Sequence, residues 1–318
     1  MNYTFVEAVF EQERKKEIWL MRYSIENEEL KVTADTLGAE LVSVINKKTN
    51  EEMIWQADPS VWDRHCPVLF PYCGKLKDGK YRLDGKEYTG AQHGFIRDLE
   101  HTFVEAKENE MRFIINSNEE TMKLFPRSFA FETKFTLKDN TLIHSLIVYN
   151  KDDKDLRFGI GFHPAFNFPF DDKHTTKDYE LQFDIPQTVI VNENYTSGPF
   201  LGFVSGEKTV LTENSKIIPL HDRLFDLDSL CLTELTAKTL SIVEKDTNKK
   251  VTVNIEGFPY VQLWSMVGTP TLRFLAIEPW HSVQDSARAN GNWDEKPCAE
   301  VLKPHERWQT DLYITFDR

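Results

Sequence analysis

Hydrophobic and polar residues alternate along much of the chain, and this two-residue period predicts β-strands. The clearest case is a pair of alternating segments, 129–137 and 142–148, separated by Asp139 and Asn140. Asp and Asn favour turns, so this stretch predicts a hairpin of two long strands. The same pattern predicts further strands within 251–265, 271–280 and 311–316.

The segment that begins at Met21 also predicts paired strands, because its apolar positions mostly alternate and Asn27 and Asn46 supply turn residues. Helical periodicity is scarce, and we expect only short helices or turns at 59–64 and 117–125. Strands do not alternate with helices, and no internal repeat is present. The sequence therefore predicts an all-β fold, a large antiparallel β-sandwich with its site on a concave face or in its loops.

Residues 1–20 differ from the rest of the 318-residue chain because they are more charged and more helical in pattern. We expect an N-terminal appendage of uncertain role there, followed by one β domain over 21–318, since such domains often exceed ~200 residues. The first 20 residues lack the layout of a signal peptide. No stretch approaches the ~20 apolar residues of a membrane span.

The composition, 40% hydrophobic and 28% charged, is ordinary for a soluble globular protein. The formal net charge of −13 makes nucleic acid and anionic membranes poor partners. The cysteines are scattered without a CxxC pair, which favours reduced thiols and a cytoplasmic location. They are Cys66, Cys73, Cys231 and Cys298.

The segment from Arg64 to Phe103 is dense in Gly, Pro and polar residues, and loops of this length are usually functional or disordered. Its aromatic residues argue against disorder. Within it, His93 precedes Gly94, and a glycine allows backbone to approach a ligand closely. We therefore treat His93 as a candidate site residue.

Two further segments carry candidate chemistry. His163 stands in GIGFHPAF directly before Pro164, which interrupts strand pairing, so we expect it at a strand end or bulge. Glu278 ends an apolar strand and is followed by Pro279 and Trp280. Burial there would raise the pKa of the carboxyl group, and a nearby histidine would oppose that rise. An aromatic ring beside polar groups suits a sugar. Each feature alone is typical of a structural role, and their joint occurrence points to a site.

Five segments together resemble the aldose 1-epimerases (galactose mutarotases), and specifically their LacX-like branch. They are TLGAELVSV, RHCPVLFPYCGKLKDGKY, QHGFIRD, GFHPAF and AIEPW, which occur in the family's order from about Met21 onward. The resemblance implies a β-supersandwich with a carbohydrate groove and a reaction that needs neither cofactor nor metal. Two places depart from the family pattern: Gly74-Lys75 replaces Gly-Arg, and His281-Ser282-Val283 replaces a small, glycine-containing loop.

The resemblance also implies residue roles. Glu278 and His163 fall on the catalytic glutamate and histidine, and His93 on a second, substrate-orienting histidine. Further sugar contacts fall on Arg97, on Gln262, and on either Asp222 or Asp228, between which the sequence does not decide. We add Trp280, Lys75 and Arg64 as candidate contacts with the sugar.

Interconversion of α and β anomers requires one group to remove the proton of the C1 hydroxyl and another to protonate the ring oxygen. We assign Glu278 as base and His163 as acid, with His93 and Arg97 holding hydroxyls. The predicted substrate is a free aldohexose such as galactose or glucose. A hexose 6-phosphate is the alternative if Arg64, Lys75, Lys77 and Arg97 form a basic corner, although Lys75 and Lys77 fit better as the solvated face of a hairpin.

Three other functions remain open from the sequence. His93, His163 and Glu278 could bind a metal ion, although the chain has no HxH spacing. Glu278 with Asp222, Asp228 or Asp285 could form the carboxylate pair of a glycoside hydrolase. A sugar-binding or sensing protein could keep the groove without turnover. The sequence makes no prediction of oligomeric state.

Overall fold

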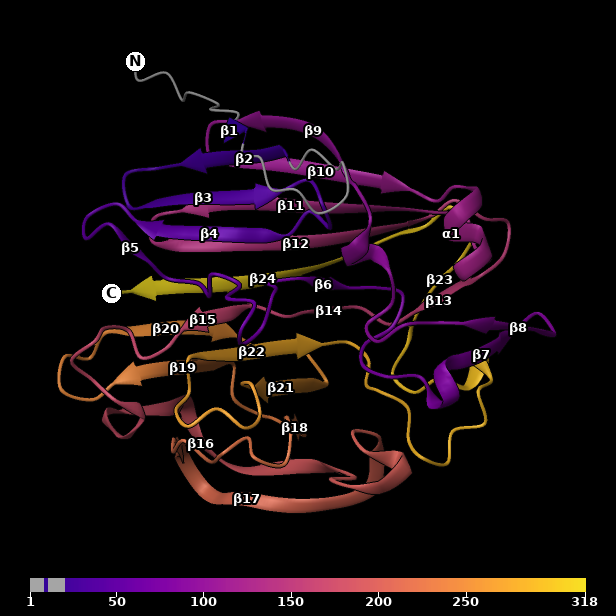
Figure 1. Cartoon of the computed structure of the whole chain (residues 1–318). Coiled ribbons are helices and arrows are strands. Elements are labelled where there is room, and N and C mark those ends of the chain that lie inside the picture. The colour runs from indigo at the N-terminus through magenta and orange to yellow at the C-terminus, as the bar shows by residue number, and fades with distance from the viewer. Residues whose placement is uncertain (1–8, 11–20) are drawn as a thin grey trace.

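The structure is a computed structural model that describes residues 9–10 and 21–318 (Figure 1). Most of the residues of the predicted N-terminal appendage, 1–20, lie outside the described residues. The two that are described form strand β1 (Val9–Phe10), which pairs with β2 (Met21–Glu26). The predicted all-β fold is confirmed, and α1 (Glu119–Leu124) is the one α-helix within the described part of the chain. No helix in that part is long and apolar enough to cross a membrane.

A five-stranded antiparallel sheet forms one layer, in the order β1 to β5. After β1 and β2 it contains β3 (Leu30–Asp35), β4 (Leu41–Asn46) and β5 (Glu51–Glu52), which confirms the paired strands predicted after Met21. The sheet packs on β9 (Thr102–Lys107) and β10 (Glu110–Asn116) of the larger sheet, and the ring of Tyr23 stacks on Phe103 at 3.6 Å between centroids (Figure 1). Burying apolar faces between the two sheets creates the sandwich core.

The larger sheet has fifteen strands in the order β6-β14-β22-β21-β18-β16-β19-β20-β24-β12-β11-β10-β9, with β15 pairing with β22 and β17 with β16. The strands are β6 (Val68–Leu69), β9 (Thr102–Lys107), β10 (Glu110–Asn116), β11 (Phe129–Lys138), β12 (Thr141–Asn150), β14 (Gly161–Phe162), β15 (Ala165–Asn167), β16 (Tyr179–Asn194), β17 (Val204–Pro219), β18 (Leu230–Thr233), β19 (Thr239–Glu244), β20 (Lys250–Asn254), β21 (Tyr260–Trp264), β22 (Phe274–Trp280) and β24 (Arg307–Asp317). Two small pairs complete the fold: β7 (Lys80–Leu83) with β8 (Lys86–Thr89), and β13 (Leu156–Phe158) with β23 (Glu300–Leu302).

The predicted hairpin is formed by β11 and β12. The pair next to the Asp139-Asn140 turn is Lys138 with Thr141. The other strands predicted from alternation are β20, β21, β22 and β24. The expected short elements are a turn at 59–61 and the helix α1, whose first turn is capped by the Asn118 side chain. All four cysteines are free, as predicted. The location inferred from their pattern stays a prediction.

Candidate functional site

The site is built on β22, which crosses the larger sheet between β14–β15 on one side and β21 on the other. On one side Gly161 pairs with Trp280 and Ala165 with Ala276, so the register places His163 opposite Glu278. On the other side Gln262 pairs directly with Glu278. Residues opposite each other in antiparallel strands have side chains on the same face. The fold therefore presents Gln262, Glu278 and His163 as one row across three neighbouring strand positions.

His163 lies in the break between β14 and β15, as the proline after it predicted. Its Nε2 lies 3.3 Å from Oε2 of Glu278, and the side chains are 7% and 3% exposed. Burial raises the pKa of Glu278, and the Asp228 carboxylate adds to the rise. Burial, followed by the charge of Arg97, lowers the pKa of His163 to about 3. Both shifts disfavour the charged forms, so the pair favours a protonated Glu278 carboxyl group beside a neutral His163 imidazole.

Two tryptophans enclose the imidazole of His163. Trp62 stacks on it at 4.8 Å between ring centroids with 24° between the planes, and Trp264 meets it edge-on at 5.6 Å. The second ring nitrogen, Nδ1, is buried without a hydrogen-bond partner. The position of this imidazole is therefore set by the two indoles and by Glu278.

The backbone of Gly74 holds His93 in one tautomer. The backbone N–H of His93 donates to the Gly74 carbonyl at 2.9 Å, and the Gly74 N–H donates to Nδ1 of His93 at 3.0 Å. Because Nδ1 accepts, the proton of the neutral ring resides on Nε2, which lies 3.1 Å from the side-chain nitrogen of Gln92. Burial and the charge of Arg97 lower the pKa of His93 well below its usual range, which keeps the ring neutral.

Gly94 makes a close approach to the backbone of Phe70. Its φ is +75°, and a Cβ atom at this position would lie 2.0 Å from the carbonyl oxygen of Phe70. This contact alone requires glycine at position 94. The effect on His93 is indirect, because the turn at Gly94 fixes the loop that carries it.

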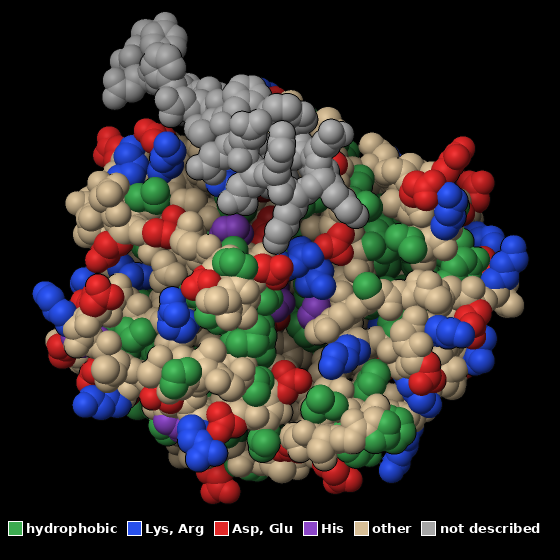
Figure 2. All heavy atoms as spheres, in the orientation of Figure 1, with side chains coloured by type: hydrophobic (Ala, Val, Ile, Leu, Met, Phe, Trp, Pro, Cys, Tyr) green, Lys and Arg blue, Asp and Glu red, His purple; other side chains and the backbone are tan. Residues whose placement is uncertain are grey.

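These side chains face one cavity of about 720 Å³, a volume typical of small-molecule sites. Figure 2 shows histidine side chains at the bottom of a hollow near the centre of one face, bordered by basic, acidic and hydrophobic groups. Nine of the ten predicted site residues line this cavity. They are Arg64, Lys75, His93, Arg97, His163, Asp228, Gln262, Glu278 and Trp280.

The tenth candidate, Asp222, does not line the cavity. Its carboxylate accepts a hydrogen bond from the Thr176 hydroxyl, which holds it in a different loop contact. Of the two aspartates between which the sequence left the choice open, the structure therefore brings only Asp228 to Glu278. Lys77 also lies outside the cavity, because its Nζ donates to the carbonyl of Ala289.

The cations at the cavity are partly neutralised by neighbours. Arg64 contacts the carboxylates of Asp98 and Glu40, the latter at 3.9 Å. Arg97 donates from Nη2 to the carbonyl of Gln92 at 2.9 Å, while its Nε is buried without a partner. Lys75 donates to the carbonyl of Leu201 at 3.4 Å.

Trp280 is 4% exposed and donates from Nε1 to the carbonyl of Phe162 at 3.2 Å. Its ring lies edge-on to that of His93 at 5.5 Å. The indole therefore forms part of the cavity floor and supports His93 as well as any ligand.

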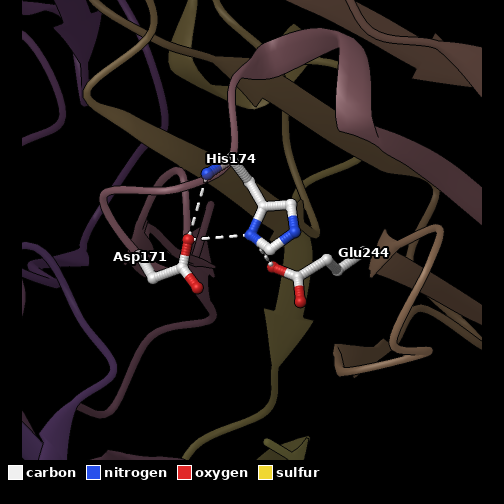
Figure 3. Close-up of side chains that lie close together, drawn as sticks. All are labelled: Asp171, His174 and Glu244. Carbon is white, nitrogen blue, oxygen red and sulfur yellow. Dashed lines mark hydrogen bonds and ion pairs between the residues drawn. The ribbon is translucent and has the colours of Figure 1, made fainter.

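The candidate metal site is not where the sequence suggested. Among the described residues, one set of three possible ligands gathers within 4.8 Å, and it is Asp171, His174 and Glu244, shown in Figure 3. His93, His163 and Glu278 do not form such a set. In the Asp171–His174–Glu244 cluster, Nδ1 of His174 lies 2.7 Å from Asp171, and hydroxyl groups of Tyr179 and Thr247 donate to Glu244. These contacts occupy Nδ1 of His174, one carboxylate oxygen of Asp171 and both carboxylate oxygens of Glu244.

Trp62, Trp264 and Gln284 are among the cavity-lining residues that sequence reasoning missed. Trp62 lies just after the 59–61 turn, Trp264 ends β21 and Gln284 follows β22 by four residues. Trp264 stands two residues after Gln262 and therefore lies on the same face of its strand. This spacing was the one sequence signal that could have identified Trp264 as a site residue. No local pattern marks the other two.

Comparison with known proteins agrees with this geometry. A family model described as aldose 1-epimerase matches residues 21–315. The chain is 31% identical over 301 residues to the plasmid-encoded protein LacX of Lactococcus lactis subsp. lactis, with 93% of this chain and 99% of that protein covered.

Two solved structures have the same fold. A galactose mutarotase related enzyme from Lactobacillus acidophilus is 31% identical with a TM-score of 0.86, covering 94% of this chain and 98% of that one. A galactose mutarotase-like protein from Lactobacillus casei is 29% identical with a TM-score of 0.84, covering 92% and 99%. The resemblance found in the five sequence segments thus extends over almost the whole described chain, and the chain belongs to the aldose 1-epimerase family of isomerases.

Proposed function

We propose that this protein interconverts the α and β anomers of a free aldohexose, such as galactose or glucose, by acid/base opening of the sugar ring. The observation that carries the proposal is the contact of 3.3 Å between His163 Nε2 and Glu278 Oε2 on the wall of the cavity. The anomeric carbon carries both reacting oxygens, the C1 hydroxyl and the ring oxygen. A base and an acid that already lie side by side suit two oxygens attached to one carbon.

In the proposed reaction, Glu278 removes the proton of the C1 hydroxyl while His163 protonates the ring oxygen and the bond from C1 to that oxygen breaks. The open-chain aldehyde then rotates about the C1–C2 bond. On closure His163 takes back the proton from the C5 hydroxyl and Glu278 returns a proton to the carbonyl oxygen. The protein ends each cycle with the protons it began with. One transferable proton on the pair is sufficient, whichever of the two groups holds it in the free protein.

The neighbouring donors would stabilise charge on the sugar oxygens. The neutral ring of His93 carries its proton on Nε2, because Nδ1 accepts from the Gly74 N–H, and a sugar oxygen would replace the side chain of Gln92, 3.1 Å away, as the partner of Nε2. Arg97 supplies a fixed positive charge close enough to lower the pKa values of both histidines. Donors placed in advance around a developing oxyanion contribute strongly in a site with little water.

A free sugar fits the charges of the cavity better than a hexose 6-phosphate does. Arg64 is paired with carboxylates, and Lys77 lies outside the cavity. Asp63, Asp226 and Asp228 line the same space, and their carboxylates would repel a phosphate. For the glycoside-hydrolase alternative, Glu278 and Asp228 are the carboxylates that could act together. Asp285 forms an ion pair with Lys296 at 2.6 Å.

Polarimetry on freshly dissolved α-D-glucose and α-D-galactose tests the proposal. The wild-type protein should speed the approach to anomeric equilibrium. Glu278→Gln should remain folded and bind sugar but lose about 10²–10⁴-fold in kcat, the usual contribution of one proton-transfer group. Glu207→Gln, at an exposed position on β17, is the matched control and should retain full activity.

Two outcomes would contradict the proposal. Sugar binding by the wild type without any acceleration would identify a binding or sensing protein. Release of reducing sugar from a disaccharide would identify a hydrolase that uses Glu278 and Asp228.

A further inference from the structure

The side chain of Gln284 is buried at the wall of the cavity, and one of its polar atoms lacks a hydrogen-bond partner. It is 5% exposed, its Nε2 donates to Asn194 Oδ1 at 3.0 Å, and its Oε1 has no partner. A buried acceptor without a donor is unfavourable, so such an atom in a native protein calls for an explanation. A ligand that donates a hydrogen bond to it would supply one.

The backbone on both sides fixes Gln284 against the cavity wall. A Cβ atom on Gly74 would lie 2.4 Å from the Cβ of Gln284, so the side chain of Gln284 occupies the space that a larger residue at 74 would need. The next residue, Asp285, donates its backbone N–H to the carbonyl of Lys75 at 3.0 Å, and its carboxylate accepts from the backbone N–H of Lys77. Gly74-Lys75, one of the two places where the sequence departs from the family pattern, therefore contacts Gln284 and Asp285, which directly follow the other place, His281-Ser282-Val283. Gly74, Lys75 and Gln284 form one wall of the cavity.

This wall presents a donor and an acceptor to the same cavity. Lys75 is a cationic donor whose Nζ lies beside Gly202 and bonds the carbonyl of Leu201. Gln284 contributes the unpartnered oxygen. A hydroxyl group can accept a hydrogen bond from Lys75 and donate one to the oxygen of Gln284. A phosphate dianion or a carboxylate can only accept, so it would place one acceptor oxygen against another at Gln284.

Resting on the proposed function, we infer that Gln284 accepts a hydrogen bond from a sugar hydroxyl and, with Lys75, selects an aldose that is unmodified at that hydroxyl over its phosphate ester or the corresponding sugar acid. Selection by an unpaired buried acceptor is effective, because an analogue that cannot donate leaves the acceptor unsatisfied. Gln284 also borders a second cavity of about 410 Å³, so the test must show to which cavity its oxygen belongs.

The test measures kcat/KM by polarimetry or by a coupled assay for a set of hexoses that each lack one hydroxyl, with the wild type and Gln284→Met. In the wild type, loss of one particular hydroxyl should lower kcat/KM about 10-fold or more, in line with a buried hydrogen bond. In Gln284→Met the parent sugar should lose a similar factor, and removal of that same hydroxyl should have no further effect. Gln309→Leu, at an exposed position on β24, is the control and should behave as wild type.

Gln284→Glu retains an acceptor oxygen and guards against misfolding of the methionine variant, because it should keep the preference for that hydroxyl. In a second comparison, Gln284→Lys should narrow the wild-type preference for the free hexose over its phosphate ester. Absence of coupling between Gln284 and every hydroxyl, in a wild type that is active, would overturn this inference and assign the oxygen to the second cavity. A wild type without mutarotase activity would instead overturn the proposed function.

Discussion

Two contacts between a histidine and a glutamate, in different regions of the molecule, have nearly the same length. The pKa of the histidine is lowered in one and raised in the other. His163 and Glu278 meet at 3.3 Å, and His174 and Glu244 at 3.4 Å. Burial lowers the pKa of His163 to about 3, whereas hydrogen bonds to Asp171 and then Asp246 raise the pKa of His174 to about 8.

The surroundings explain the difference. The ring of His163 lies between indoles with one carboxylate partner, and cationic Arg97 is close by. The ring of His174 lies among three carboxylates, which are those of Asp171 and Glu244, shown in Figure 3, and that of Asp246. The comparison shows that a His–Glu contact stabilises the charged forms only where water and further carboxylates support them. The first contact is suited to moving a proton and the second to holding one.

The largest expected effect is a difference in activity between the variants of the two histidines. His163→Asn should lower kcat for mutarotation by about 10²–10⁴-fold, because the acid that protonates the ring oxygen is lost. His174→Asn should leave kcat unchanged, since the His174 cluster does not line the cavity. Polarimetry at neutral pH measures both, and equal losses in the two variants would remove the distinction.

A smaller effect is expected from opening the aromatic enclosure of His163. Trp62→Ala should lower kcat about 10-fold or more, because the imidazole loses the ring that positions it. Water admitted to the site should also raise the pKa of His163 toward its usual value, which would move the acidic limb of the pH–rate profile upward. Trp308→Ala removes a half-buried indole from β24 outside the cavity and is the control. An unchanged pH profile in Trp62→Ala would show that Trp62 does not influence the proton affinity of His163.

The two glutamates should respond in opposite ways when stability is measured. Glu244→Gln should destabilise the fold by about 1–3 kcal/mol, because the carboxylate accepts hydrogen bonds from Tyr179 and Thr247. Glu278→Gln should be neutral or stabilising by about 1 kcal/mol at pH 8, since the raised pKa of Glu278 means that its ionised form is disfavoured in the fold. Urea denaturation gives both values, and a clear loss of stability in Glu278→Gln would count against this assignment.

The smallest effect concerns the pH dependence of stability. The pKa of His174 is raised above its unfolded value of about 6.5, so its contribution is fully present below that pH and is lost as the pH rises through about 8. Wild type and His174→Asn should therefore differ in melting temperature at pH 6 and converge by pH 9. A difference that persists undiminished at pH 9 would show that the histidine acts through packing and not through charge.

Much of this site could be predicted because its key residues carry local signals. A proline directly after His163 marks a strand break, and a carboxylate within an apolar run marks Glu278, although the strand β22 continues beyond it to Trp280. The fold class followed from alternation, which is strong in hairpins such as β11–β12. Local patterns suffice where one strand position determines which way a side chain points.

The remainder depends on contacts between distant segments. Asp222 and Asp228 lie in one irregular loop without a period, so nothing in the sequence told which would face the cavity. Trp62 and Gln284 reach the cavity only because the loops around 62, 74 and 284 meet there. The ion pair of Asp285 with Lys296, which removes this aspartate from consideration as a catalytic acid, likewise forms only in the folded chain.

The most direct test of the central claim is the rate of mutarotation of the double variant His163→Asn/Glu278→Gln beside the two single variants. Groups that act on one substrate as a unit are not additive in their effects. We expect the double variant to be no slower than the slower single variant. Losses that multiply would show that the two side chains act independently and would contradict a shared proton-transfer role.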